Sequence, residues 1–148
     1  MKKLIEAQDI IKAAKLNKFG GGSTARILML LLKINKINKI YSDISNYSGT
    51  EFIDHLIKEL KINYKFNEEE LSRIPKSGPF IIVANHPYGG IDGMLLVKIV
   101  AQVRDDYKTM ANFLLQQLEP VKDYILPVNP FEDRKDAKSS LAGIKSSL

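Results

Sequence analysis

The stretch from residue 80 to residue 103 constrains the fold of this chain more than any other, because it joins two kinds of hydrophobic pattern through a tight turn. Residues 80–84 are typical of a buried strand, whereas the apolar stretch 94–103 is typical of a helix. Pro87 and the pair Gly89-Gly90 lie between them and favour a turn. The pattern predicts a strand, a turn and a helix in succession, as in an α/β domain.

This turn also carries His86 and Asp92, with five residues between them. An imidazole titrates near neutral pH and can take a proton from a hydroxyl, and a nearby carboxylate can stabilise the imidazolium. The chain has no cysteine and no Gly-x-Ser-x-Gly sequence, so the usual nucleophiles for such a pair are not indicated. The pair therefore favours a reaction in which His86 activates a substrate hydroxyl directly and no covalent acyl-enzyme forms. The alternatives are a structural His86 and an Asp92 that serves as the N-cap of a helix starting near Gly93.

The sequence Asn85-His86-Pro87-Tyr88-Gly89-Gly90-Ile91-Asp92 resembles the signature of the glycerolipid acyltransferases, which is Asn-His followed closely by Asp. It looks most like the bacterial branch described as hemolysin-like or 1-acylglycerol-3-phosphate acyltransferases. That family usually leaves four residues between His and Asp, and the glycine pair can absorb the fifth because glycine accepts a positive φ. The resemblance implies that His86 is the general base and Asp92 its partner, with Asn85, Gly89 and Gly90 at the substrate.

Residues 126–135 are similar to the second block of that family, in which an arginine after a short strand is associated with the polar head of the acceptor. The resemblance implies that Asn129 and Arg134 bind the acceptor, since a guanidinium can hold two anionic oxygens at once. The alternative is that Arg134 belongs to a solvated helix start within the charged run 132–136. The third block of the family, Phe-Pro-Glu-Gly, does not occur before Leu148, so we expect the front part of such a domain, with its C-terminal part missing.

The resemblance implies transfer of a fatty acyl group from acyl-CoA or acyl carrier protein to a hydroxyl of a lysophospholipid-like acceptor, or of an amino-acid lipid. Both thioesters are substrates, and no cofactor is expected. No metal is expected either, because two histidines and no cysteine are too few for a zinc site. His55 lies in the helical run 51–61 and is interpreted as structural. The alternative function is a non-catalytic, membrane-binding fragment of such an enzyme.

The positive charge of the chain is concentrated in its first third. The net charge is +5 overall, with +6 on residues 1–50 and −1 on residues 51–148. No nucleic-acid motif accompanies the basic segment and its aromatic residues form no stacking array, so no nucleic-acid partner is expected. An anionic membrane surface is the partner that the charge favours.

The hydrophobic pattern of the same segment supports a membrane partner. A first helix is expected over residues 4–16 and a second from Ser23 or Thr24, with an apolar run at 27–32 followed by Lys33, Lys36 and Lys39. The run is far shorter than the ~20 residues that cross a bilayer, so it predicts an interfacial helix. The alternative is that it packs against the catalytic domain. With no secretory signal at the Met1-Lys2-Lys3 start, we expect a peripheral protein on the cytoplasmic face of the inner membrane.

A change of hydrophobic period near residue 61 predicts two regions. A capping-box sequence at 48–51 favours a helix over 50–60, and alternation favours a strand over 62–66. Further strands are expected at 108–111 and 124–128, with a final helix over 136–148. The expected fold is α/β, a glycerolipid-acyltransferase-like mixed sheet flanked by helices and preceded by amphipathic helices. Residues 1–61 are the expected membrane-interface segment, and 62–148 the front part of the acyltransferase domain.

Overall fold

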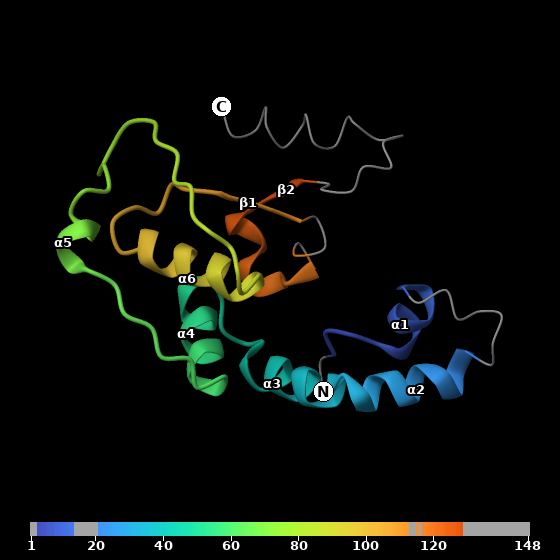
Figure 1. Cartoon of the computed structure of the whole chain (residues 1–148). Helices are drawn as coiled ribbons and strands as arrows, with labels where there is room; N and C mark the ends of the chain where they lie inside the picture. The colour runs from blue at the N-terminus through green and yellow to red at the C-terminus, as the bar shows by residue number, and fades with distance from the viewer. Residues whose placement is uncertain (1–2, 14–20, 113–114, 116, 129–148) are drawn as a thin grey trace. The chain divides into compact units, whose positions relative to one another are not determined.

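The computed structural model describes residues 3–13, 21–112, 115 and 117–128. The chain divides into two compact units, Met1–Asn46 and Tyr47–Leu148, whose elements are labelled in Figure 1. The division at residue 61 that we predicted between a membrane segment and a catalytic domain is a functional one and stays a prediction.

Unit 1 contains the helices α1 (Ala7–Ala13), α2 (Gly21–Leu31) and α3 (Ile34–Ile44). The backbone of Lys33 has a φ of 53°, in the left-handed region, and this residue separates α2 from α3. A non-glycine residue is rare in that conformation, which explains why the sequence pattern gave no sign of the break. The second expected helix is confirmed, although it begins at Gly21.

A buried asparagine ties the N-terminal segment of unit 1 to α3. The Asn38 side chain is 1% exposed. Its Oδ1 accepts hydrogen bonds from the backbone N–H groups of Leu4 and Ile5 at 3.0 and 2.9 Å, and its Nδ2 donates to the carbonyl of Ile5 at 2.8 Å. These bonds satisfy the buried amide. The buried apolar residues of unit 1 in the described structure are Ala25, Ile34, Tyr41 and Ile44.

Unit 2 combines helices with a small parallel sheet. Its elements are α4 (Gly49–Glu59), α5 (Glu68–Leu71), α6 (Gly90–Val100), β1 (Thr109–Asn112), the 3-10 helix η3 (Glu119–Tyr124) and β2 (Ile125–Val128). The strands pair in parallel, with Thr109 opposite Ile125 and Asn112 opposite Val128, and η3 lies in the connection between them. This arrangement agrees with the α/β class, whereas the larger mixed sheet stays a prediction.

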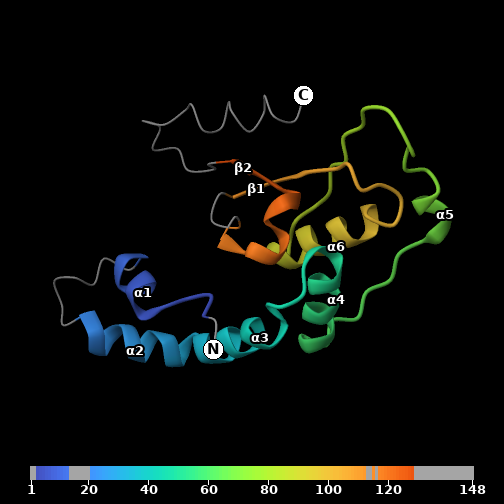
Figure 2. The same ribbon diagram turned by 180° about the vertical axis from the view of Figure 1, so that it is seen from behind.

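The core of unit 2 forms where α4 packs against α6 and η3 (Figure 2). Buried side chains come from each of these elements: Phe52, Ile53, Val97, Val100 and Val121. Asp54 of α4 and Lys98 of α6 form an ion pair across the same contact. Gly49 begins α4 with a φ of 59°, and an added Cβ would lie 3.2 Å from Tyr124 Oη, so glycine is required there on two counts.

The expected buried strand over residues 80–84 is wrong for the described structure. Residues 79–86 have no regular secondary structure and pair with no described strand, and Ile81 and Val83 are 90% and 89% exposed. The strand expected at 62–66 is likewise unpaired among the described residues. Both errors have one cause: an apolar or alternating run can predict an extended backbone, but a sheet also needs a hydrogen-bonding neighbour.

Candidate active site

His86 and Asp92 come close together where the irregular segment 79–86 turns into α6. His86 Nδ1 lies 3.9 Å from Asp92 Oδ2. This separation is too long for a hydrogen bond, but it places the carboxylate within ion-pair distance of a protonated imidazole. The His86 side chain is 61% exposed and that of Asp92 only 21%, so a reactant can reach the ring while the carboxylate is partly shielded.

The backbone of the turn holds the Asp92 carboxylate in place. Asp92 Oδ2 accepts a hydrogen bond of 2.7 Å from the backbone N–H of Tyr88. Gly89 is the N-cap of α6, so Asp92 lies in the first turn of the helix and is not its N-cap, as one alternative had it. A negative charge is favoured there by the unsatisfied N–H groups of the helix start.

The two glycines allow a turn with five residues between His86 and Asp92. Gly89 has a φ of 63° and a ψ of −129°, a backbone conformation that is essentially restricted to glycine. Gly90 begins α6, and added Cβ atoms at both positions would meet nothing within 4 Å. A Cβ at Gly93 would lie 3.9 Å from His86 Cε1, so the imidazole lies beside the first turn of α6.

The other predicted site residues fall into two groups. Asn85 is exposed directly before His86, and Gly89 and Gly90 form the turn, so the structure brings these three beside His86 and Asp92. Asn129 and Arg134 lie outside the described residues. Within the described ranges, no group of three His, Cys, Asp or Glu side chains could hold a metal ion.

Arg104, just beyond the C-terminal end of α6, contacts the loop that leads toward His86, and the sequence patterns did not single it out. Its guanidinium donates to the carbonyls of Pro75 and Gly78 at 3.2 and 2.8 Å, and Nε donates to Asp106 Oδ1 at 2.6 Å. The guanidinium also lies 4.7 Å from the centre of the Phe80 ring. An arginine followed by two aspartates at a helix end is usually solvated, so no local signal marks these contacts.

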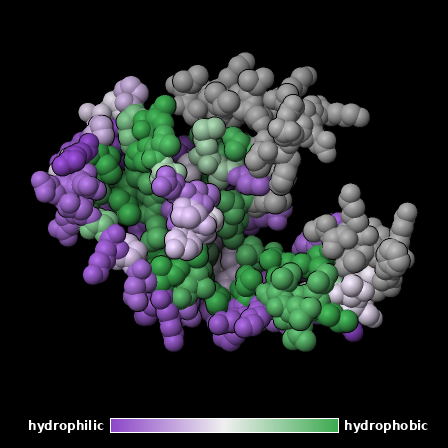
Figure 3. All heavy atoms as spheres, viewed as in Figure 1, coloured by the Kyte–Doolittle hydropathy of each residue, from purple (hydrophilic) through white to green (hydrophobic). Residues whose placement is uncertain are grey.

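Unit 1 presents an apolar surface along α2, visible in Figure 3. Ile27, Leu30, Leu31 and Leu32 are 59%, 72%, 69% and 57% exposed. Lys33 and Lys36, which follow this run, are also exposed. In the part of the chain that the structure describes, no helix has both the length and the apolar character to cross a membrane.

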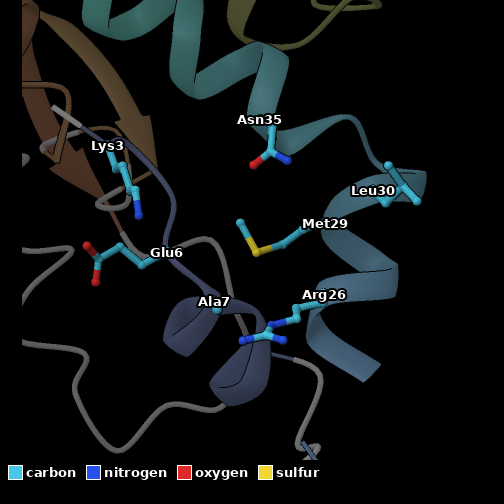
Figure 4. A pocket seen from close by; sticks show the side chains of 7 residues that line it. All are labelled: Lys3, Glu6, Ala7, Arg26, Met29, Leu30 and Asn35. Carbon is cyan, nitrogen blue, oxygen red and sulfur yellow. The ribbon is translucent and has the colours of Figure 1, made fainter. Parts of the chain in front are cut away.

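A cavity of about 460 Å³ lies beside this surface in unit 1, between α1 and α2 (Figure 4). Arg26, Met29 and Leu30 of α2 line one side of it, and Glu6 and Ala7 line the other. None of the site residues predicted from the sequence contributes to its lining.

Comparisons with known proteins agree in naming an acyl-transfer activity. A sequence model of the family described as "Acyltransferase" matches residues 9–142. Two curated proteins named lyso-glycine lipid O-acyltransferase, from Bacteroides thetaiotaomicron and Phocaeicola vulgatus, are each 26% identical over 129 residues. That similarity covers 85% of this chain but 47% and 46% of the relatives, so the chain spans about half of their length. No solved structure matches the chain with significance.

Proposed function

Because this chain belongs to the acyltransferase family, whose sequence model matches residues 9–142, we propose that the protein is an O-acyltransferase acting on lipids. It moves a fatty acyl group from an acyl thioester, acyl-CoA or acyl carrier protein, to a hydroxyl of a lysolipid acceptor. The observation that carries the proposal within the site is the approach of His86 Nδ1 to Asp92 Oδ2 at 3.9 Å, at an exposed turn.

In the proposed reaction, His86 takes the proton from the acceptor hydroxyl through Nε2, and the hydroxyl oxygen attacks the thioester carbonyl. When the tetrahedral intermediate collapses, the C–S bond breaks and the imidazolium returns the proton to the leaving sulfur. Asp92 stabilises the imidazolium during these steps, held by its hydrogen bond from Tyr88 N–H. Contacts between catalytic groups that are long in the free enzyme commonly tighten when substrate binds, and we expect the 3.9 Å separation of His86 and Asp92 to shorten in this way.

Two classes of acceptor fit this chemistry. A lysophosphatidate-like acceptor is implied by the resemblance of residues 85–92 to the glycerolipid acyltransferases, and Arg134 would bind its phosphate. A lyso-glycine lipid, which presents a carboxylate in place of a phosphate, is the acceptor in the names of the two curated relatives. We favour the amino-acid lipid because those names belong to proteins similar over 85% of this chain.

We also propose that unit 1 contacts an anionic membrane, peripherally and on the cytoplasmic face. The exposed apolar residues of α2, with Lys33 and Lys36 directly after them, form a surface with the two properties that an interfacial helix needs. Lysines near anionic headgroups contribute about 1 kcal/mol each, and burial of leucine side chains adds to this. Lys39 contributes less, because it pairs with Asp43 at 2.7 Å.

The membrane contact is tested by sedimentation with phosphatidylglycerol-containing vesicles. Leu31→Glu should lower the bound fraction about 10-fold or more, because it replaces an exposed apolar group, which the bilayer would cover, with a charge. Ile81→Glu is the control, since Ile81 is an apolar residue of unit 2 that is even more exposed than Leu31. Equal loss of binding in both variants would contradict a specific contact through α2.

The activity is tested by mixing the chain with acyl-CoA and either lyso-glycine lipid or lysophosphatidate. Because the chain has no cysteine, released thiol can be followed directly with a thiol reagent. His86→Ala should abolish transfer, whereas His55→Phe, which keeps the ring stacked on Tyr47, should retain it. Full turnover in His86→Ala would end the assignment, and vesicle binding without any transfer would favour a non-catalytic, membrane-binding fragment.

A further inference from the structure

We propose that Arg104 is a positioning residue for His86, an inference that rests on the proposed function. Its guanidinium hydrogen-bonds to the loop at Pro75 and Gly78, so the segment that leads to His86 is attached at its start to the C-terminal end of α6. At its other end, the hydrogen bond from Tyr88 N–H to Asp92 attaches the segment to the N-terminal end of the same helix. The helix thereby sets the distance between the two attachments of the segment.

The first step of the argument is that Arg104 is itself fixed to α6. Beyond Val100, the chain continues in a hydrogen-bonded turn, with the N–H groups of Val103 and Arg104 both donating to the Val100 carbonyl at 2.9 and 3.0 Å. The Arg104 side chain is only 8% exposed. Asp106 binds its guanidinium through both carboxylate oxygens, and this two-point contact fixes the plane of the guanidinium.

The second step is that the remaining donors of Arg104 hold the incoming loop. One terminal nitrogen donates to the carbonyls of both Pro75 and Gly78, so it holds the loop at two points three residues apart. Gly78 has a φ of 81°, in the left-handed region that favours glycine. The ring of Phe80 then stacks under it at 4.7 Å. The chain is therefore held at residue 80.

The third step concerns the segment between the two attachments. Residues 81–87 form no hydrogen bond with any other part of the chain that the structure describes, and Ile81 and Val83 are almost fully exposed. The course of this segment therefore depends on its ends. Freeing one end increases the number of conformations open to it, and a displacement of about 1 Å at a reacting group can cost about 100-fold in rate.

The contacts of Arg104 separate this role from general stabilisation. Its side-chain partners are Pro75, Gly78, Phe80 and Asp106, none of which belongs to the core formed by Phe52, Ile53 and Val97. Replacing Arg104 should therefore loosen the segment and leave the cooperative core intact. Lysine cannot replace it, because an ammonium cannot bind a carboxylate in a fork and two carbonyls in fixed directions.

The test uses the full 148-residue chain, which has no cysteine and can therefore carry two unique nitroxide labels. The labels are placed at Val83→Cys on the segment and Lys58→Cys on an exposed position of α4, both in unit 2. Electron-electron resonance then gives the distribution of distances between them. We expect Arg104→Ala and Arg104→Lys to widen this distribution, and Arg73→Ala, an exposed arginine of the same loop, to leave it unchanged.

Acyl transfer by the unlabelled variants supplies the second measurement. We expect kcat to fall about 10-fold or more in both Arg104 variants, with the KM for acyl-CoA unchanged, because the reacting group is displaced and not the binding surface. An unchanged distance distribution, or a widened one with wild-type kcat, overturns the positioning role. If the wild-type chain shows no acyl transfer, the proposed function is overturned instead. The attachment of the segment by Arg104 is then tested by the label distances alone.

Discussion

The backbone N–H of Tyr88 donates to Asp92 Oδ2 over 2.7 Å, and the same oxygen lies 3.9 Å from His86 Nδ1. One carboxylate oxygen thus closes the glycine turn and faces the imidazole. The geometry of the turn and the electrostatics of the proposed base therefore depend on a single side chain, and suitable substitutions can separate the two.

Replacing Asp92 with asparagine removes the charge but keeps an oxygen that can accept from Tyr88 N–H. We expect Asp92→Asn to lower the free energy of unfolding by less than about 1 kcal/mol, the contribution of a charge at a helix start. Acyl transfer should fall about 100-fold or more, because the imidazolium loses its counter-charge. Asp92→Ala, which removes the acceptor too, should also destabilise the turn. Wild-type turnover in Asp92→Asn would show that the charge has no part in the reaction.

Gly89 and Gly90 provide a matched pair for measuring backbone strain. Both have open space where a Cβ would be added, but only Gly89 has a positive φ. Gly89→Ala should cost about 1–3 kcal/mol of unfolding free energy, whereas Gly90→Ala, in the first turn of α6, should be neutral or stabilising by up to about 1 kcal/mol. Urea unfolding measures both, and equal stabilities would mean that the turn is not strained.

Tyr107 should make stability depend on alkaline pH. Its hydroxyl donates to the carbonyl of Val97 at 2.5 Å, and burial, with a smaller effect of Tyr124, raises its pKa above the ordinary 10.0. The folded state then holds the phenolic proton more tightly than the unfolded state, so this contribution is complete below pH 10 and is lost as pH rises further. Tyr107→Phe should cost about 0.5–1.5 kcal/mol at neutral pH.

The pH dependence distinguishes Tyr107 from an ordinary tyrosine. The stability difference between wild type and Tyr107→Phe should begin to shrink near pH 10 and keep shrinking up to about pH 12, as measured by urea unfolding at each pH. Tyr88→Phe is the control, because the Tyr88 side chain is 76% exposed. A constant difference across that range would argue against a shifted pKa.

Asn38 should decide whether the N-terminal segment stays attached to α3. Asn38→Leu keeps the size of the side chain but removes three hydrogen bonds, at an expected cost of about 1–3 kcal/mol. Hydrogen exchange at the amides of Leu4 and Ile5 should accelerate, since both donate to Asn38. Asn35→Leu, one turn earlier at an exposed position, should leave their exchange unchanged.

Elements that depend on local chemistry could be predicted from the sequence. The strand expected at 124–128 is observed at Ile125–Val128. The helix after Ser48 also forms, although Ser48 makes no side-chain cap bond. The strand expected at 80–84 failed because its neighbour is set by the tertiary fold, which an isolated pattern does not encode.

The same contrast holds within the candidate site. His86, Asp92 and the glycine turn are contiguous in sequence, so their proximity follows from local geometry. Arg104 reaches Pro75 and Gly78 from 29 and 26 residues away, and no spacing rule connects such positions.

The left-handed residue Lys33 has a consequence for how the protein could meet a bilayer. It divides the chain into α2 and α3, of 11 residues each. At about 1.5 Å per residue, each helix is about 16 Å long, roughly half the thickness of the hydrocarbon layer. Either helix, once inserted, touches the acyl tails of one leaflet only. If the protein acylates lipids as proposed, its acceptor and its product would then lie in the same leaflet.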